Sequence, residues 1–366
     1  MVIKLKRNKS LIVIIGLIIL TLSGCSSKES NEEVAINLFD MQKANSIVKD
    51  YLNNVIVGNF DNANSLLSDE LLSSNKDTGE GVSEIISYKP DTSIEGSNYG
   101  YFIYNIVRSS GVEPKSDLEN ITFKIRKQKN EYKIDEIKSK SEKEIYIKGN
   151  GLRVIGEEGG KSNLIISLNS LPKDTYLRDN KVMLYKDIVP KDYFGKVCLS
   201  FTGQRIAITT TNNKDSYICI AYIDDSLMAS TQPGGEGGNS EASVGTSGID
   251  DLQAALEKPI AKKLVPVDLL KDSKITKLIF SEKEDILQVN YNNKYDKERI
   301  RLYKSSDGAL IPTELDSMFP EDKYSITEGR FVDEEFEFKV INLSDSEDSL
   351  NGDYVMILKT SNINKL

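Results

Sequence analysis

Few side chains in this sequence stand at spacings that could perform chemistry, and the first candidate is a cysteine near the N-terminus. Cys25 follows the small residues Ser23 and Gly24, which come after an apolar run, Leu11–Leu22. A thiolate is a strong soft nucleophile, and small neighbours let the backbone enter the groove of a modifying enzyme. These residue types suit a thiol that receives an acyl group.

The segment before Cys25 has the layout of an export signal. Lys4–Lys9 is positively charged, and the 12 apolar residues that follow are too few for a membrane span of about 20. The motif Leu22-Ser23-Gly24-Cys25 resembles the lipobox of bacterial lipoproteins. That resemblance implies cleavage between Gly24 and Cys25, lipidation of Cys25, and anchoring at the extracytoplasmic face of the cell membrane. Two acyl chains make such attachment stable, unlike a single chain. An uncleaved signal anchor is the alternative.

Composition excludes several classes of function. The chain has no histidine, so Ser-His-Asp catalysis and most catalytic zinc sites are excluded. Without the first 24 residues, 43 basic and 56 acidic residues remain, a formal net charge of −13. Such a chain has no general electrostatic attraction for nucleic acid or anionic lipid headgroups. We expect no nucleic-acid partner, and membrane contact only through the lipid on Cys25.

A glycine-rich segment, Gly156–Ser162, resembles a nucleotide-binding P-loop at first sight. The P-loop spacing requires glycine at position 155, where this chain has Ile155, and a helix should follow. Residues Asn163–Leu168 instead have the apolar pattern of a strand. We therefore expect a hairpin turn and no bound nucleotide or other cofactor.

Two further cysteines, Cys198 and Cys219, could form a disulfide, because export leads to an oxidising compartment. The expected strands place them on the first and third strands of one meander, two spacings of about 4.8 Å apart. This exceeds the Cα separation of about 7 Å that a disulfide tolerates. Two buried free thiols are favoured.

The spacing Ser-x-x-Lys occurs at Ser73 and Lys76 and again at Ser170 and Lys173. On a helix this spacing places hydroxyl and amine on one face, as in Ser-Lys catalysis. No Lys-Thr-Gly partner motif follows either pair. Chance occurrence in a lysine-rich chain is the favoured interpretation.

An acidic cluster near the C-terminus could hold calcium, although its spacing does not match an EF-hand loop, and a solvated surface loop is favoured. An aromatic cluster in a β-rich run could stack on a sugar, although core packing is favoured. The acidic cluster consists of Asp345, Asp348, Asn351 and Asp353. The aromatic cluster consists of Tyr99, Tyr101, Phe102 and Tyr104.

The first part of the exported chain, residues 41–142, should be α+β. Apolar residues recur at helical spacing from Ala44 to Ile56, Gly58-Asn59 ends the pattern, and Asp61 is placed to cap a short second helix. Residues 101–107 are β-rich, and alternating residues on both sides of 128–131 predict a hairpin. This order, with the phrase NEYKIDEI at its end, is similar to NTF2-like domains, which implies a curved sheet wrapped by helices around a concave pocket. The match is loose, since Tyr132 stands where tryptophan is usual.

The rest of the chain, residues 143–366, should be mostly β and repetitive. An internal repeat has the same order in both copies: a strand ending in Phe-Thr or Phe-Ser, a second strand, an Asn-Asn-Lys turn and a third strand. The first copy contains Phe201-Thr202 and Asn212-Asn213-Lys214, and the second contains Phe280-Ser281 and Asn292-Asn293-Lys294. The first copy resembles a single TolB-type propeller repeat, although the aspartate of the usual Asp-Gly turn is absent. At most four such units fit, whereas propellers use four to eight blades. A small or incomplete propeller and a stack of β-meanders both remain open.

The expected domain plan has five parts. It comprises a signal peptide (1–24), a flexible tether (25–40), an NTF2-like α+β domain (41–142), and a β-repeat domain (143–366) interrupted by a Gly/Ser-rich loop (229–249).

The function expected from this plan is that of a lipid-anchored binding or scaffold protein of the cell envelope, whose partner is another envelope protein or a cell-wall polymer. The alternative is a carbohydrate-active or peptidoglycan-active enzyme that uses a pair of carboxylates. A solute-binding protein with two lobes is disfavoured, because no alternating strand-helix pattern is present.

Overall fold

The computed structural model describes residues 39–74, 83–128, 131–157, 160–176, 184–224, 226 and 257–366, and residues 39–366 belong to one compact unit. The expected signal peptide, the tether up to residue 38 and the Gly/Ser-rich loop 229–249 lie outside the described residues. Cleavage at Gly24 and lipidation of Cys25 therefore stay predictions. In the described part of the chain, no helix is both long and apolar enough to cross a bilayer.

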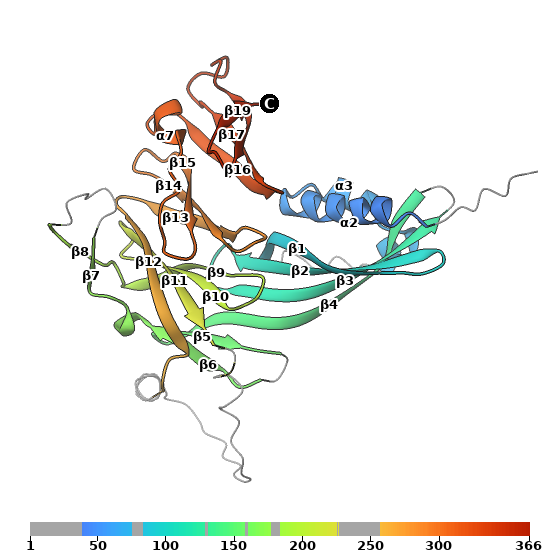
Figure 1. Ribbon diagram of the computed structural model, residues 1–366, viewed down its shortest axis with the longest axis horizontal. Coiled ribbons are helices and arrows are strands. Elements are labelled where there is room, and N and C mark those ends of the chain that lie inside the picture. Colours follow the sequence, from blue (N-terminus) through green and yellow to red (C-terminus); the bar gives the residue numbers. More distant parts are fainter. Residues whose placement is uncertain are drawn as a thin grey trace, which may run out of the picture. The chain divides into compact units, whose positions relative to one another are not determined.

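The described residues are mostly β, as expected for the larger part of the chain. Three helices come first, then a six-stranded sheet, a two-stranded hairpin, and three antiparallel sheets of three or four strands in succession (Figure 1). The helices are α2 (Met41–Ile56), α3 (Phe60–Ser65) and α4 (Asp69–Ser74), and a single turn, α7 (Leu315–Met318), comes much later.

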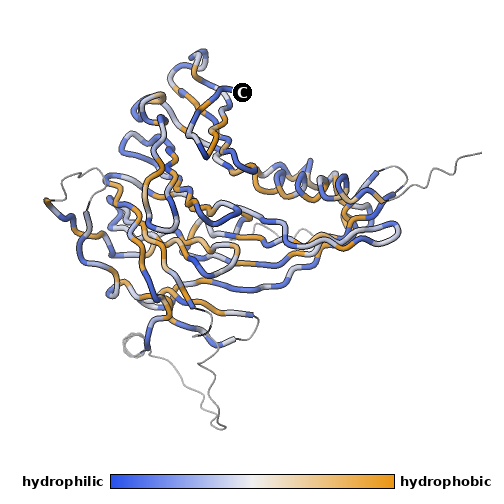
Figure 2. The backbone as a smooth tube through the Cα atoms, in the orientation of Figure 1, coloured by the Kyte–Doolittle hydropathy of each residue, from blue (hydrophilic) through white to orange (hydrophobic). Residues whose placement is uncertain are grey.

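Helix α2 forms where the apolar period predicted it. Its N-cap is Asp40, whose Oδ1 accepts the backbone N–H groups of Gln42 and Lys43, both at 3.0 Å. Its buried face packs on the first sheet, and this is the side of the helix that carries the apolar residues in Figure 2. The buried residues are Ala44, Val48 and Leu52.

The cap of the second helix differs from the expectation. Asp61 lies in the first turn of α3, and the N-cap is Asn59, whose side chain accepts the N–H of Asn62 at 3.4 Å. Helix α2 ends at Ile56 and Gly58 takes a left-handed φ of +74°, so the chain turns at the Gly58-Asn59 pair as the sequence indicated. Asn59 thereby reaches the cap position before Asp61 does.

The first sheet is a meander of six antiparallel strands in the order β1-β2-β3-β4-β5-β6. The expected boundary between residues 142 and 143 falls inside β4, and β5 and β6 continue the same sheet. No break in the sheet separates the two expected domains there. The strands are β1 (Ser83–Glu95), β2 (Tyr99–Ser110), β3 (Ser116–Gln128), β4 (Glu131–Lys148), β5 (Gly151–Ile155) and β6 (Asn163–Ser167).

The predicted repeat forms two meander sheets. One contains β9 (Tyr193–Leu199), β10 (Arg205–Thr211), β11 (Ser216–Ile223) and β12 (Ala261–Leu270). The other contains β13 (Lys274–Phe280), β14 (Ile286–Asn292) and β15 (Glu298–Lys304). A short hairpin, β7 (Asp174–Thr175) with β8 (Asp187–Ile188), precedes the first of them.

Hydrogen bonding aligns the two copies of the repeat differently from the alignment that their sequences suggested. Ser200 and Ser281 hold equivalent places, since each donates its N–H to the first residue of the next strand at 2.9 Å. Leu199, rather than Phe201, is therefore the counterpart of Phe280, and Phe201 lies in the turn. The paired phenylalanines misled the alignment because both are buried, one at a strand end and one in a turn.

A third small sheet closes the chain, with the order β16-β17-β18-β19. Three successive meander sheets therefore follow the first sheet among the described residues, within the maximum of four units expected. Its strands are β16 (Ser325–Val332), β17 (Glu335–Ile341), β18 (Gly352–Ile357) and β19 (Ile363–Lys365).

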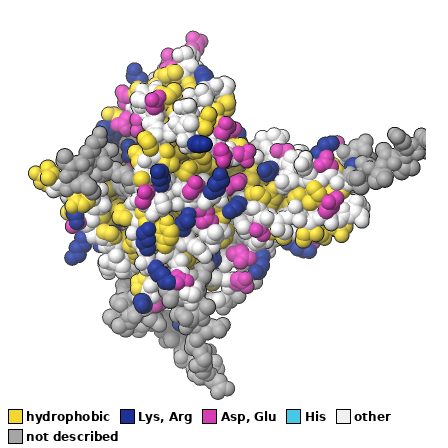
Figure 3. Space-filling view, viewed as in Figure 1, with side chains coloured by type: hydrophobic (Ala, Val, Ile, Leu, Met, Phe, Trp, Pro, Cys, Tyr) yellow, Lys and Arg dark blue, Asp and Glu magenta, His cyan; other side chains and the backbone are white. Residues whose placement is uncertain are grey.

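Three hydrophobic clusters fill the fold. One lies between α2 and the first sheet, one joins the far end of that sheet to the two repeated sheets, and one lies between the second repeat and the last sheet. On the face drawn in Figure 3, acidic and basic side chains are interspersed, so this face has no patch of a single sign.

Candidate functional site

The glycine-rich segment lies between two antiparallel strands, as expected. Val154 of β5 pairs with Asn163 of β6, so the chain reverses direction there and no helix follows. The hydroxyl of Ser162 accepts hydrogen bonds from Tyr146 Oη and Arg153 Nε, both at 2.7 Å. Ser162 thus has a structural role, and the segment lacks the helix N-terminus that a P-loop requires.

Cys198 and Cys219 are buried free thiols, which confirms the favoured interpretation. Cys198 pairs with Ala207 and Cys219 with Ile208, which are neighbours on β10, so the two thiols point to opposite faces of the sheet. Burial raises the pKa of each thiol to about 12, which leaves both protonated at neutral pH. Neither is suited to nucleophilic chemistry.

The Ser-x-x-Lys pairs do not form catalytic dyads in the described residues. Ser73 donates its hydroxyl to the carbonyl of Glu70 within α4, and Lys76 lies outside the described part. Ser170 ends a single 3-10 turn, and Lys173 lies beyond it, so no helix face carries both. Sequence spacing suggested a shared face that the local structure does not provide.

The acidic cluster forms a hydrogen-bonded loop before β18. Asp348 accepts the hydroxyl of Tyr324 at 2.7 Å and the amide of Asn342 at 3.0 Å. Its pKa is lowered, chiefly by the backbone N–H of Leu350, while this hydrogen bond to Asp348 raises the pKa of Tyr324 to about 12. These carboxylate oxygens hold the loop together. Across the described residues, no group of three or more Cys, Asp or Glu side chains is placed to hold a metal ion.

The aromatic cluster on β2 is divided between the two faces of the sheet. Phe102 and Tyr104 are buried beneath α2, and the hydroxyl of Tyr104 donates to Asn45 at 2.5 Å. Tyr99 and Tyr101 lie on the other face with their rings edge to face, 5.4 Å apart. The alternation of side chains along a strand therefore rules out one stacking platform built from all four.

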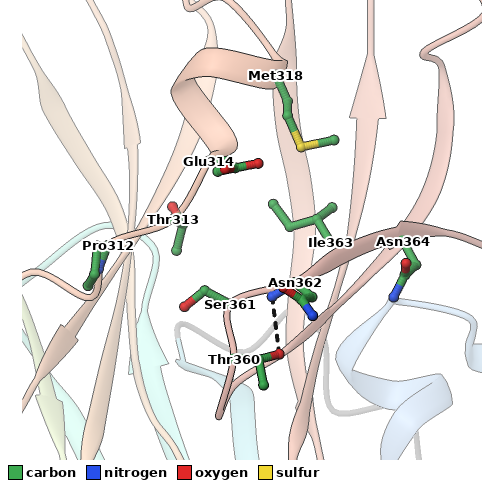
Figure 4. A pocket seen from close by; sticks show the side chains of 9 residues that line it. All are labelled: Pro312, Thr313, Glu314, Met318, Thr360, Ser361, Asn362, Ile363 and Asn364. Atoms are coloured by element: carbon green, nitrogen blue, oxygen red, sulfur yellow. Dashed lines mark hydrogen bonds between the residues drawn. The ribbon is translucent and has the colours of Figure 1, made fainter.

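The candidate binding site is a polar cleft of about 530 Å³ that sequence analysis did not indicate. One wall is the extended segment Pro312–Glu314 before α7, and the other is the turn and strand from Thr360 to Asn364. Figure 4 shows the side chain of Met318 on α7 pointing toward that of Ile363 in the second wall, and these two residues supply apolar surface. The volume is in the range of small-ligand sites.

Several polar side chains of this cleft have no hydrogen-bond partner within the described part of the chain. The hydroxyl of Thr360 accepts the N–H of Asn362 at 3.4 Å and shapes the turn (Figure 4). Next to it, Ser361 takes a left-handed φ of +59°, a conformation that costs energy in a residue other than glycine. Asn362 and Asn364 are exposed, so their amides are free to hydrogen-bond a polar ligand in place of water. The uncommitted side chains are Thr313, Glu314, Ser361, Asn362 and Asn364.

A second cleft, of about 410 Å³, lies between the first helices and β16. It is lined by Asp50, by several asparagines of α2 and α3, and by Arg330. Arg330 Nε donates to Glu337 Oε2 at 2.6 Å, so its charge is already matched. Each of the two clefts has one lining carboxylate, Glu314 in the first and Asp50 in the second. Glycoside hydrolysis commonly uses two that face one another.

The sequence carried one weak signal for the first cleft. Residues 359–364 are Lys-Thr-Ser-Asn-Ile-Asn, a polar stretch around one apolar residue, which resembles an ordinary surface turn. The segment 312–314 lies far away in the chain, and only folding brings the two together. A cleft built from two distant segments has no local sequence pattern.

Comparisons with known proteins do not assign a family. No family model and no curated protein matches the chain. Among solved structures, puromycin hydrolase matches at 6% identity over 75% of this chain and 46% of that one, with a TM-score of 0.30. Oligopeptidase B from Trypanosoma brucei matches at 10% identity over 88% and 43%, with a TM-score of 0.30, and Hsv2 from Kluyveromyces lactis at 9% over 73% and 83%, with a TM-score of 0.26.

The chain spans less than half the length of both hydrolases. Similarity at this level supports no argument about activity, so the candidate site rests on the geometry alone.

Proposed function

We propose that this chain is a lipid-anchored binding or scaffold protein on the extracytoplasmic face of the cell membrane, with no enzymatic activity of its own. The anchor is lipid on Cys25 after cleavage at the Gly24–Cys25 bond. The exported part combines an NTF2-like α+β module with propeller-like β-repeats. Its partner is another envelope protein or a cell-wall polymer.

The observation that carries the binding role is the cleft between residues 312–314 and 360–364. It offers five uncommitted polar side chains but a single carboxylate, Glu314. Hydrogen-bonding groups without a paired acid and base favour recognition over hydrolysis. The buried thiols, the hydrogen-bonded acidic loop and the lone Ser-x-x-Lys serines add no nucleophile to the site.

The anchoring is tested by metabolic labelling with radioactive palmitate and by membrane fractionation. The wild-type chain should incorporate label and sediment with membranes, because two acyl chains give stable attachment. The variant Cys25→Ala should lose the label and leave the membrane fraction. The matched control, Cys198→Ala, removes a buried thiol and should keep both. Unchanged fractionation of Cys25→Ala would refute the proposal.

The binding role is tested by capture from solubilised envelopes onto the full chain. A partner or glycan that is retained by the wild type should be lost when Asn362 and Asn364 are both changed to alanine. Changing Asn64 and Asn150, two exposed asparagines that do not line the cleft, provides a control with the same chemistry at another place. Retention that is the same for both double variants would place binding outside the cleft.

A further inference from the structure

The cleft lies along an unpaired edge of the last sheet. Strand β19 is the terminal strand in the order β16-β17-β18-β19. The N–H of Ile357 donates to the carbonyl of Asn362 at 2.9 Å, and Met356 pairs with Ile363. In an antiparallel ladder, hydrogen-bonded and non-bonded pairs alternate. Ile363 therefore directs its N–H and C=O away from β18, toward the cleft that it lines.

A second ladder bond confirms this register. The N–H of Leu366 donates to the carbonyl of Asp353 at 2.9 Å, so the bonded pairs fall at every second residue on β19. Lys365, like Ile363, then occupies a non-bonded position. Two residues of the edge thus offer backbone donors and acceptors on the side where no strand lies.

We propose that the cleft accepts an extended peptide segment of a partner protein, which adds to the sheet as a further strand beside β19. This inference rests on the proposed binding function and names the chemistry of the partner. Peptide recognition by strand addition takes its affinity from main-chain hydrogen bonds and its specificity from pockets for alternate side chains. Met318 and Ile363 provide the apolar contact for one set of side chains.

Charge determines which peptide fits best. Among the described residues that line the cleft, Glu314 is the only charged one, and its carboxylate makes no ion pair with them or with the rest of the described chain. A basic side chain on the peptide would match it, whereas an acidic one would be repelled. Asn364 on β19 and Asn362, directly before this strand, stand two residues apart and can hydrogen-bond polar side chains of the added strand.

A saccharide fits the same cleft less well. None of the nine lining residues is aromatic, so no ring is available to stack on a sugar face. The outward N–H and C=O of Ile363 form the donor and acceptor pair of a strand edge, which a peptide backbone matches residue for residue.

The test uses the full chain in detergent micelles and a fluorescein-labelled hexapeptide of alternating valine and threonine with one central lysine. Fluorescence anisotropy should show saturable binding of this peptide. The same peptide with central glutamate should bind about tenfold more weakly, since one charge contact is replaced by repulsion. Absence of saturable binding by both peptides, or equal affinity for the two, would overturn the inference.

Variants at Ile363 and Glu314 test whether the peptide binds beside β19. Ile363→Pro removes the outward N–H without removing a ladder bond to β18, because proline is tolerated on an edge strand whose N–H faces away from its neighbour. It should weaken binding of the lysine peptide about tenfold, whereas Ile363→Val, which keeps the outward N–H, should weaken binding much less. Glu314→Gln leaves the backbone intact and should abolish the preference for lysine over glutamate. Unchanged affinity in Ile363→Pro together with unchanged preference in Glu314→Gln would refute strand addition at this edge.

Failure of the peptide inference can be distinguished from failure of the proposed function. If the peptide fails to bind while Cys25→Ala still leaves the membrane fraction and envelope capture still depends on the asparagine pair, only the peptide inference fails. If Cys25→Ala stays with the membrane, the anchored role fails, whatever the peptide does.

Discussion

The carboxylate of Glu284 accepts hydrogen bonds from the backbone N–H and the hydroxyl of Thr202, at 2.6 and 2.9 Å, and thereby joins the turns of two successive meander sheets. Glu284 stands where the preceding repeat has Gly203, and both residues take a left-handed φ, +58° and +66°. A buried glutamate in this conformation bears a backbone cost that glycine does not. The bond between sheets offsets that cost.

Replacing Glu284 should therefore show two opposing effects. Glu284→Ala loses the charge-assisted bonds and keeps the backbone cost, so the free energy of unfolding should fall by about 2–4 kcal/mol. Glu284→Gly loses the same bonds and relieves a cost of about 1 kcal/mol, so it should be less destabilised. Urea titration followed by circular dichroism measures both. Equal losses for the two variants would contradict the strain argument.

Asp268 should be a strong determinant of stability. Its carboxylate accepts the hydroxyl of Tyr303 at 2.6 Å and pairs with Arg301 at 3.2 Å, and its side chain is 3% exposed. Asp268→Ala leaves a largely buried guanidinium without this partner and should cost about 3–5 kcal/mol. Glu334→Ala removes an exposed pair with Lys283 and should cost less than about 1 kcal/mol. Thermal unfolding of both variants under one buffer condition compares them. Similar melting temperatures would argue against the buried network.

The two thiols predict a loss of stability at alkaline pH. Burial raises the pKa of Cys198 and Cys219 to about 12, above the value of about 8.5 for an exposed thiol. The folded chain then holds these protons more tightly, so their stabilising contribution is complete below about pH 8.5 and declines as the pH rises toward 12. The urea concentration at the unfolding midpoint should decrease as the pH is raised from 8 to 10. It should decrease less in a double Cys198→Ala, Cys219→Ala variant. Identical pH dependence in the two proteins would show that the thiols stay accessible.

Gly308 should not tolerate a side chain. It takes a φ of +71°, and an added Cβ would lie 2.3 Å from the carbonyl oxygen of Pro266 on β12. Backbone atoms cannot give way as a flexible side chain does, so Gly308→Ala should destabilise the fold by about 2 kcal/mol or more. Gly111 has no atom within 4 Å of the same position, and Gly111→Ala should change the free energy of unfolding by less than about 0.5 kcal/mol. Differential scanning calorimetry of the pair tests this contrast. A stable Gly308→Ala protein would mean that the turn rearranges.

Local pattern was sufficient for several elements of this fold. The apolar period from Ala44 to Ile56 predicted α2, because 3.6-residue periodicity follows directly from burying one helix face. The alternation around residues 128–131 predicted the β3–β4 hairpin, since strand pairing across a short turn is also local. The same reasoning placed Cys198 and Cys219 on strands too far apart to bridge.

Other features depended on how distant segments meet. The cap of α3 is Asn59 and not Asp61, because the side chain of Asn59, directly after the left-handed Gly58, accepts the N–H of Asn62. The first sheet continued through β5 and β6 beyond the expected boundary, because strand pairing does not stop where composition changes. The inter-sheet bond from Glu284 to Thr202 joins residues of two repeats that no local rule connects.

The sequence by itself led to the expected location of this protein, through a leader of charged, apolar and small residues that ends at Cys25. It also determined the order of strands and turns in residues 193–304. Only the tertiary structure brought Glu314 opposite Ile363 and left one edge of β19 open. Leader and strand patterns are written in neighbouring residues, whereas a cleft is a relation in space between segments that the chain separates by tens of positions.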